Sequence, residues 1–343
     1  MKALVLSRYK QLDIVETAKP NPAEDELLIR IAACGICGSD VHGYDGSTGR
    51  RIPPIIMGHE AAGIVEGVGA AASGFQRGDR VTFDSTVSCG KCFFCLRGQV
   101  NLCDERQVIG VSTSNYRRMG AFAEYVTVPA RIGYHLPNTM PFTHAALIEA
   151  VSVAVHAISL SPIALEDTIV IVGAGMIGLL ALQAARCAGA GAVFVVDIDD
   201  SRLELARNLG ATRTLNSQRA GIVQDVLQAT TGRGADTVLE CVGTSITVKL
   251  AVDMVRKGGA ITLVGNIAPS ITLELQSAVT RQIRLQGSCA SSGEYPKCIS
   301  LISREAIRVE PLLSAVAPLE DGPMWFRRLH EREAGLLKIV LQP

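Results

Sequence analysis

A glycine-rich segment near the middle of the chain constrains the fold more than any other feature. Gly173-Ala174-Gly175-Met176-Ile177-Gly178 has the spacing G-x-G-x-x-G; the apolar run Thr168–Val172 precedes it and the helical run Ile177–Ala188 follows it. The first glycine permits a tight turn, the second lets a pyrophosphate approach the backbone, and the third allows close packing of helix and strand. The segment therefore predicts a dinucleotide site at the N-terminus of a helix.

The residues around this motif alternate between apolar strands and helices. Further strands are expected at Val193–Val196, Thr237–Cys241, Ala260–Val264 and Ile283–Gln286, and a further helix at Arg202–Leu209. Strands that are apolar throughout are typical of a parallel sheet covered on both faces by helices. We expect an α/β chain in which residues 151–287 form a doubly wound, dinucleotide-binding domain.

Residues 1–150 have a different pattern. Short β-branched runs are separated by turn residues, at Leu27–Ala32, Gly63–Val68, Arg80–Phe83 and Ala123–Val128. This pattern predicts an antiparallel β-domain. Residues 288–343 end in the strand-like run Leu336–Leu341, which we expect to return to the first domain.

Asp197 indicates which dinucleotide the chain binds. It ends the second predicted strand, at the distance expected of the acidic residue that bonds the adenosine ribose 2′-OH and repels a 2′-phosphate. NAD is therefore favoured over NADP, although Arg202 close by weakens that preference. Val242, Val264 and Gly265, at the ends of later strands, complete the predicted cofactor site.

Four of the ten cysteines, Cys89, Cys92, Cys95 and Cys103, lie on one short loop at about 89–103. Four thiolates are enough for a closed tetrahedral zinc site, which holds a loop together but has no open position for chemistry. An iron–sulfur cluster is a competing interpretation, and unligated or redox-active cysteines are another.

A second set of metal-ligand candidates is scattered along the first domain. Cys37, His59 and one of Glu60 or Glu149 would supply the three protein ligands of a catalytic zinc, which keeps a fourth position open. Each of these residues alone is more often a packing residue than a ligand. The prediction rests on their combination, and the choice between the two glutamates stays open.

Together these motifs resemble the zinc-containing medium-chain alcohol dehydrogenase family, in its sorbitol, polyol and threonine dehydrogenase branch. Gly58-His59-Glu60-x-x-Gly63-x₅-Gly69 resembles the family's zinc signature, and Gly35–Asp40 its first metal-ligand segment. The four-cysteine loop resembles its structural zinc lobe, and the glycine motif with Asp197 its NAD fingerprint. The resemblance implies a GroES-like β catalytic domain with an inserted Rossmann domain, one catalytic and one structural zinc per chain, and a homo-oligomer, either dimer or tetramer.

The resemblance also implies a reaction. Zinc would lower the pKa of a coordinated secondary alcohol, polyol or sugar hydroxyl, and the zinc-bound alkoxide would pass a hydride to NAD⁺. Cys37, His59 and Glu60 or Glu149 would be the ligands. Ser39 and His42 match the positions that relay the proton to solvent, and Asp40 would contact a metal ligand.

Two segments bear on the substrate. Sorbitol dehydrogenases carry an Arg-Tyr pair that holds the polyol where this chain has Ala290 and Ser291, so sorbitol itself is not predicted. The insert Ser112–Arg118 lies where family members line the substrate pocket. Its two arginines could meet a sugar acid or a phosphate, but we favour solvated surface residues. The alternative within the family is a threonine-type amino-alcohol or 2,3-diol dehydrogenase.

Composition separates the remaining function classes. Thirty-three basic residues balance thirty-three acidic ones, so the basic excess of a typical nucleic-acid binder is absent. We therefore rank a zinc-stabilised nucleic-acid module below the enzyme. A catalytically silent scaffold also ranks below it, because the ligand candidates Cys37, His59, Glu60 and Glu149 are intact. The sequence has no long apolar run and no convincing signal peptide, so we expect a cytoplasmic protein without a membrane span.

Overall fold

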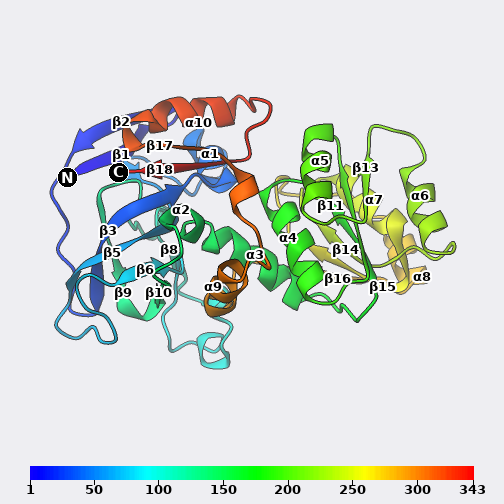
Figure 1. Cartoon of the computed structure of the whole chain (residues 1–343), viewed down its shortest axis with the longest axis horizontal. Helices are drawn as coiled ribbons and strands as arrows, with labels where there is room; N and C mark the ends of the chain where they lie inside the picture. The colour runs from blue at the N-terminus through cyan, green and yellow to red at the C-terminus, as the bar shows by residue number, and fades with distance from the viewer. The chain divides into compact units, whose positions relative to one another are not determined.

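The chain passes from one structural unit into a second and then returns to the first. The computed structural model describes all 343 residues. The first unit comprises Met1–Glu149, Tyr295–Ser303 and Val309–Pro343, and the second comprises Ala150–Glu294 and Arg304–Arg308 (Figure 1). The expected boundaries were 150/151 and 287/288. Residues 288–294 group instead with the second unit, and so does the short segment Arg304–Arg308.

The first unit is built mainly from antiparallel strands. The strands are β1 (Lys2–Arg8), β2 (Gln11–Glu16), β3 (Glu26–Gly35), β4 (Ile55–Ile56), β5 (Glu60–Val68), β6 (Arg80–Phe83), β7 (Thr86–Val87), β8 (Gln107–Val108), β9 (Tyr125–Pro129), β10 (Gly133–His135), β17 (Leu313–Pro318) and β18 (Lys338–Gln342). The largest sheet has the order β10-β6-β5-β3-β18-β17, and β9 also pairs with β3. Because Val340 of β18 pairs with Gly35 of β3, the last strand of the chain lies beside the strand that leads to Cys37. The predicted antiparallel β-domain is confirmed.

Helices are short in this unit. They are α1 (Gly38–Tyr44), α2 (Phe142–Ala145), α9 (Tyr295–Ser303) and α10 (Gly322–His330), with 3-10 turns η1 (Cys95–Arg97), η2 (Val100–Leu102), η3 (Ala130–Ile132), η4 (Glu310–Leu312) and η5 (Leu319–Asp321); α3 (Ile148–Ser159) begins here and continues into the second unit. At the start of α1, Cys37 accepts a hydrogen bond from the Ser39 N–H while the Asp40 side chain bonds back to the Cys37 N–H. This reciprocal cap fixes where α1 begins. The core beneath the sheets is apolar and includes Leu27, Ile29 and Phe122.

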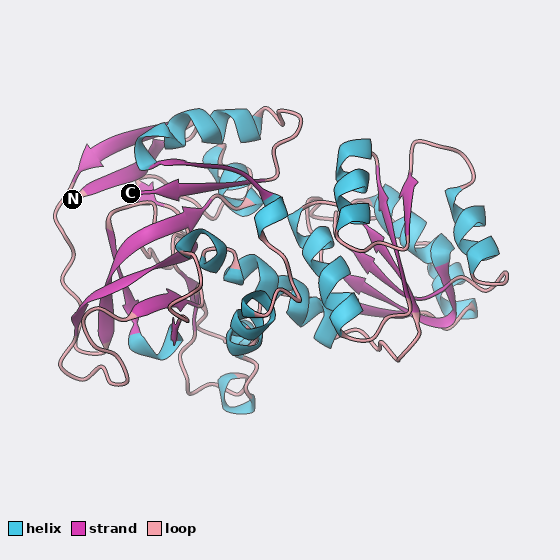
Figure 2. Ribbon diagram, in the orientation of Figure 1, coloured by secondary structure: helices cyan, strands magenta, loops and turns pink.

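The second unit is a six-stranded parallel sheet with the order β13-β12-β11-β14-β15-β16. Its strands are β11 (Thr168–Val172), β12 (Ala192–Asp197), β13 (Arg213–Asn216), β14 (Ala235–Glu240), β15 (Val255–Leu263) and β16 (Arg284–Gly287), and its helices are α4 (Met176–Cys187), α5 (Asp200–Asn208), α6 (Ile222–Ala229), α7 (Ser245–Met254) and α8 (Leu275–Thr280). Helices cover both faces of the sheet (Figure 2), and Val170, Phe194 and Val238 are buried between the layers. The predicted doubly wound α/β fold is confirmed. No helix anywhere in the chain is both long enough and apolar enough to cross a membrane.

Candidate active site

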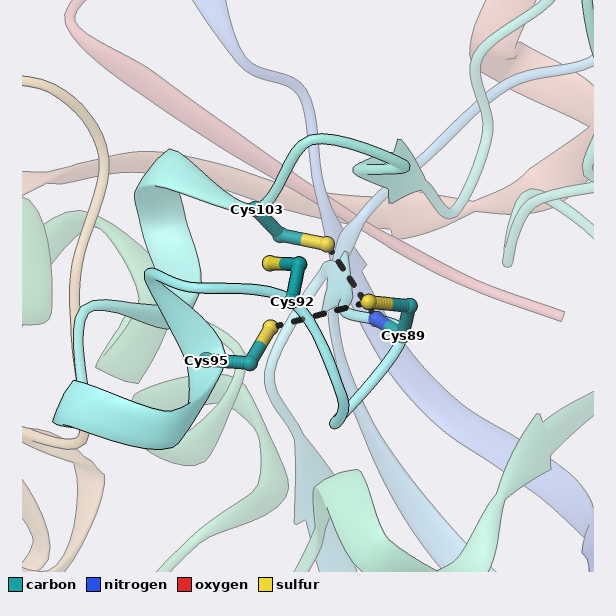
Figure 3. Close-up of side chains that lie close together, drawn as sticks. All are labelled: Cys89, Cys92, Cys95 and Cys103. Atoms are coloured by element: carbon teal, nitrogen blue, oxygen red, sulfur yellow. Dashed lines mark hydrogen bonds between the residues drawn. The ribbon is translucent and has the colours of Figure 1, made fainter.

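The four cysteines of the predicted lobe lie together. Their sulfur atoms all fall within 4.8 Å of one another (Figure 3), and none of the four is in a disulfide. The backbone N–H of Cys89 also points at Cys103 Sγ, at 3.2 Å. Hydrogen bonds from the backbone at Cys95 and Asp104 lower the pKa of Cys92 to about 6, so its thiolate form is accessible at neutral pH.

The loop that carries these cysteines has almost no apolar core of its own. None of the residues of η1 is buried, and the side chains of Phe93 and Leu96 are largely exposed. A loop without buried apolar contacts needs another source of order, and four converging sulfurs suit a tetrahedral metal. The donor set therefore fits a structural zinc.

Cys37, His59 and Glu60 form the second group of metal-ligand candidates. One donor atom from each lies within 4.8 Å of the other two. Cys37 precedes α1, while His59 and Glu60 stand where the chain enters β5. His59 and Glu60 are buried and Cys37 is half-buried. A thiol, an imidazole and a carboxylate are the donors that zinc accepts, and three of them leave one position open.

Asp40 and Arg51 stand behind the histidine. Asp40 Oδ1 lies 3.4 Å from His59 Nδ1, and it accepts hydrogen bonds from Arg51 Nε at 3.2 Å and Nη2 at 2.9 Å. All three side chains are buried. Burial opposes ionisation of Asp40, but the charges of His59 and Arg51 outweigh it and hold the pKa of this carboxyl well below its usual range. Asp40 thus lies beside His59, a candidate ligand.

The two candidate glutamates are placed differently. Glu60 is in the group with Cys37 and His59, and its Oε2 accepts a hydrogen bond from Lys338 Nζ at 2.6 Å. Glu149 is outside that group, with its Oε1 3.5 Å from Ser85 Oγ. Burial, with Glu60 and Asp84 nearby, raises the pKa of Glu149 to about 7. The geometry thus favours Glu60 as the third donor.

Ser39 and His42 both lie on α1. Ser39 Oγ is 3.5 Å from His59 Nε2, and it accepts a weak hydrogen bond from Arg51 Nη2 at 3.4 Å. Ser39 and His42 are exposed, His42 in the last turn of the helix. Ser39, the first member of the expected relay, therefore lies beside His59 of the group Cys37, His59 and Glu60, which we call the metal-ligand group. His42, the second member, is exposed to solvent one helical turn away.

The glycine motif of the second unit has the geometry of a dinucleotide site. Gly173 has a φ of +103°, in the region that favours glycine. A Cβ on Gly178 would lie 1.8 Å from the Gly173 carbonyl oxygen, whereas one on Gly175 would meet nothing within 4 Å. No side chain caps the N-terminus of α4. The first N–H groups of this helix therefore have no side-chain cap, and the space beside Gly175 is open, as an anion site requires.

The other predicted cofactor residues surround the carboxyl ends of the strands. Asp197 Oδ2 accepts the Ala174 N–H at 2.5 Å, and its Oδ1 accepts the N–H groups of the two residues that follow. The side chain of Val242 packs against Gly173, and Val264 and Gly265 both donate their N–H groups to Glu240 O. Arg202, on α5, lies 3.7 Å from Asp199 Oδ2. Ligands of parallel sheets bind at this edge.

Sequence analysis missed two residues of the metal-ligand group's surroundings. Lys338 is the one charged residue in the apolar run Leu336–Leu341, and that anomaly was a usable signal. Nothing in the sequence distinguishes Arg51 from an ordinary surface residue, because it stands beside Arg50 in a polar loop. The arginines of the insert, Arg117 and Arg118, line a cavity of about 440 Å³ whose lining contains none of Cys37, His59 and Glu60.

Comparison with known proteins decides the family. Residues 23–138 match the model of the alcohol dehydrogenase GroES-like domain, and residues 177–304 match that of the zinc-binding dehydrogenases. The zinc-type alcohol dehydrogenase-like protein YdjJ of Escherichia coli (strain K12) is 35% identical over 337 residues, which are 96% of this chain and 95% of that protein. The chain belongs to the zinc-containing alcohol dehydrogenase family. The resemblance seen in the motifs is thereby confirmed.

Two further relatives match this chain over almost the whole of both sequences. Sorbitol dehydrogenase of Bacillus subtilis (strain 168) is 32% identical, across 100% of this chain and 97% of that protein. A zinc-binding dehydrogenase from Sinorhizobium meliloti 1021, solved with NADP, is 32% identical with a TM-score of 0.93 and covers 100% of this chain and 99% of its own. Zinc and a nicotinamide dinucleotide are thus the family's cofactors. That relative was solved with NADP, whereas the sequence of this chain predicts NAD.

Proposed function

We propose that the chain is a zinc-dependent, NAD-linked dehydrogenase that oxidises a secondary alcohol of a polyol or sugar. The observation that carries the proposal is the Cys37, His59 and Glu60 group, whose donor atoms lie within 4.8 Å of one another. Family membership and the uncapped glycine-rich helix of the second unit support it. A neutral charge balance and this family membership speak against a nucleic-acid module.

In this proposal the two metal sites have separate tasks. Cys37, His59 and Glu60 would hold the catalytic zinc, and Glu149 remains the alternative third ligand. When bound, that zinc supplies Lewis-acid chemistry, which lowers the pKa of an alcohol hydroxyl. Cys89, Cys92, Cys95 and Cys103 hold the structural zinc, which stabilises the loop.

The chain's side chains then transfer the proton, and its glycine motif holds the hydride acceptor. Ser39 would accept the hydroxyl proton as it gives up its own, and His42, exposed on the same helix, would deliver a proton to solvent. A bound NAD⁺ would supply the acceptor for the substrate hydride. Gly173, Gly175 and Gly178, with the N–H groups of Met176 and Ile177, hold the pyrophosphate of the dinucleotide.

The preference for NAD rests on Asp197. Its carboxylate stands at the end of β12 and contacts the glycine turn through Ala174 N–H. A carboxylate there accepts a hydrogen bond from the ribose 2′-OH but repels a 2′-phosphate. Arg202 supplies one opposing charge, although it already lies near Asp199.

The substrate is a polyol or sugar alcohol held without an arginine clamp. Ser291 is buried and Ala290 has no polar side chain, so this segment offers no cation to a substrate hydroxyl. The relatives favour a polyol, and this segment favours one other than sorbitol. A threonine-type or 2,3-diol substrate is the less favoured alternative within the family.

Two further expectations concern the state of the protein in the cell. All ten cysteines are free, and two metal sites need thiolates, which suits the reducing cytoplasm. Strand β16, which contains Leu285, is the edge of its sheet and is exposed throughout, and the apolar Leu275 and Val279 of α8 are exposed too. An uncovered edge with apolar neighbours favours pairing with a second copy, so we propose a homo-oligomer.

A substrate panel tests the proposed activity. Polyols, sugar acids, threonine and 2,3-diols are offered with NAD⁺ and with NADP⁺, and absorbance of the reduced cofactor is followed. We expect NADH from a secondary alcohol of the polyol class. Cys37→Ser should abolish turnover while NAD⁺ still binds, and Cys187→Ser, an exposed cysteine outside both groups, should not. Full turnover by Cys37→Ser would exclude the ligand role of Cys37.

A further inference from the structure

Arg51 is an arginine almost wholly inside the protein, with 4% of its surface exposed. Two of its N–H groups converge on one oxygen, Asp40 Oδ1, from Nε at 3.2 Å and Nη2 at 2.9 Å. A third, from Nη1, is bonded to Arg50 O at 3.1 Å. Burying a guanidinium is costly unless it is paired in this way, so the position serves the carboxylate that it contacts.

The same Asp40 oxygen faces the histidine of the metal-ligand group. It lies 3.4 Å from His59 Nδ1, and Arg51 Nη2 also reaches Ser39 Oγ at 3.4 Å. Carboxylates that contact a metal-binding histidine fix the orientation of its ring and its basicity. Arg51 therefore touches both the group that orients His59 and the hydroxyl beside His59, and it touches no ligand itself.

The arginine reaches Asp40 through a gap that a glycine leaves in α1. A Cβ on Gly43 would lie 2.1 Å from Arg51 Cγ and 3.0 Å from Arg51 Cβ. Gly43 does not have a positive φ, so the helix itself places no demand for glycine there. Alanine would in fact favour a helix at this position. The absence of a side chain at Gly43 is thus explained by the passage of Arg51.

The backbone of Arg51 is held in place from the other side. Arg51 and Ser112 form a bridge, with Ile52 N–H bonded to Ser112 O at 3.1 Å and Ser112 N–H bonded to Arg50 O at 3.2 Å. Ser112 is fully buried. Arg51 is therefore held at three places. Its backbone pairs with Ser112, its methylene groups pack against Gly43 of α1, and its guanidinium bonds Asp40.

We propose that Arg51 is a positioning residue of the metal site, which enters through the gap at Gly43 and holds Asp40 so that Asp40 fixes the His59 ring. The inference rests on the proposed metal site at Cys37, His59 and Glu60. Without Arg51, Asp40 would remain buried with no permanent cation beside it, and it would lose the two hydrogen bonds that fix its position. His59 would then lose its support, and the metal would be held less firmly.

Cobalt substitution tests the positioning role without relying on turnover. The full chain is loaded with Co²⁺, and the visible absorption band that is lost in Cys37→Ser is assigned to this site. In Arg51→Met we expect that band to shift and the metal to leave for a chelator roughly 10- to 100-fold faster than from the wild type. Arg51→Lys, which restores the charge without the planar group, should recover part of the loss.

Gly43→Ala separates positioning from a general effect on stability. A purely structural role predicts a lower unfolding temperature from the clash with Arg51 but an unchanged cobalt band and unchanged metal retention. The proposal predicts the same faster metal loss as in Arg51→Met, because the methyl group displaces the arginine. This variant also carries the test if Arg51→Met does not fold. Gly38→Ala, in the same helix but with nothing within 4 Å of the new Cβ, and Arg50→Met, the exposed neighbour, should retain the metal like the wild type.

The outcomes are distinct. Faster metal loss in both Arg51→Met and Gly43→Ala, with both controls normal, supports the proposal. Wild-type metal retention and a wild-type band in these two variants would overturn it while leaving the metal site intact. A wild-type chain with no cobalt band that depends on Cys37 would overturn the proposed metal site itself.

Discussion

Lys338 and Glu60 form a buried ion pair between the last strand of the chain and the entry to β5. Lys338 Nζ donates to Glu60 Oε2 at 2.6 Å, and the side chains are only 3% and 1% exposed. Lys338 also donates to Ile36 O at 3.1 Å, next to Cys37. The C-terminal strand thus supplies the cation that balances the carboxylate of the metal-ligand group.

Removing this cation should destabilise the protein strongly. In Lys338→Met a buried carboxylate loses its partner, which typically costs about 3–5 kcal/mol. Urea unfolding of wild type and variant measures the difference. Lys2→Met breaks a pair of similar length with Glu320, but both of those side chains are about half exposed, so that control should change little. Equal effects of the two variants would contradict the role assigned to Lys338.

Alanine substitutions at the two later glycines of the dinucleotide motif should have different effects. Gly178→Ala places a Cβ 1.8 Å from the Gly173 carbonyl oxygen, so it should lower the unfolding temperature as well as NAD⁺ affinity. Gly175→Ala meets nothing within 4 Å and should leave stability unchanged, but its methyl group would keep the pyrophosphate from the backbone. Thermal unfolding and calorimetric NAD⁺ titration distinguish the two. Normal NAD⁺ binding by Gly175→Ala would place the cofactor elsewhere.

Cofactor preference should depend on the charge of Asp197. Asp197→Asn keeps one of the two oxygens that accept backbone N–H groups and removes the charge that repels a 2′-phosphate. We expect kcat/KM with NADP⁺ to rise relative to NAD⁺ by about tenfold, which corresponds to about 1.4 kcal/mol. Asp197→Ala should change the ratio in the same direction. Asp200→Asn, on the neighbouring helix, serves as the control, and an unchanged ratio in both Asp197 variants would remove this residue from the ribose site.

The four-cysteine loop should depend on its metal. Cys95→Ser leaves three thiolates, so we expect the loss of one zinc ion per chain and a lower Tm, since bound metal contributes folding energy. A loss of about 3 kcal/mol corresponds to a fall of roughly 6–12 °C for a unit of this size. Cys187→Ser, an exposed cysteine of the second unit, should change neither quantity. A Tm equal to that of the wild type would argue against a structural zinc.

The fold could be predicted from the sequence because its signals are local. The glycine motif, the apolar strands around it and the four-cysteine loop each lie within a short stretch of chain, and short-range geometry decides them. The boundary at 288 was placed too early, because the strand pattern ends at Gly287 while the following loop stays with the second unit.

The surroundings of the metal-ligand group depend instead on contacts between distant residues. Lys338 and Glu60 meet only because β18 returns to β3, far along the chain. The passage of Arg51 past Gly43 depends on side-chain packing around a short helix, which no spacing rule describes. Sequence spacing brought Cys37 and His59 into one hypothesis, but only the folded structure separates Glu60 from Glu149.

Metal counting coupled to turnover tests the central claim most directly. The chain is purified without added zinc, its zinc is counted by mass spectrometry, and NADH formation from the polyol panel is measured on the same samples of wild type and Cys37→Ser. The account predicts two zinc ions and NADH formation for the wild type, and one zinc and no NADH for the variant. A wild type that holds one zinc or none and yet oxidises the alcohol, or a variant that keeps both ions and its activity, would contradict it.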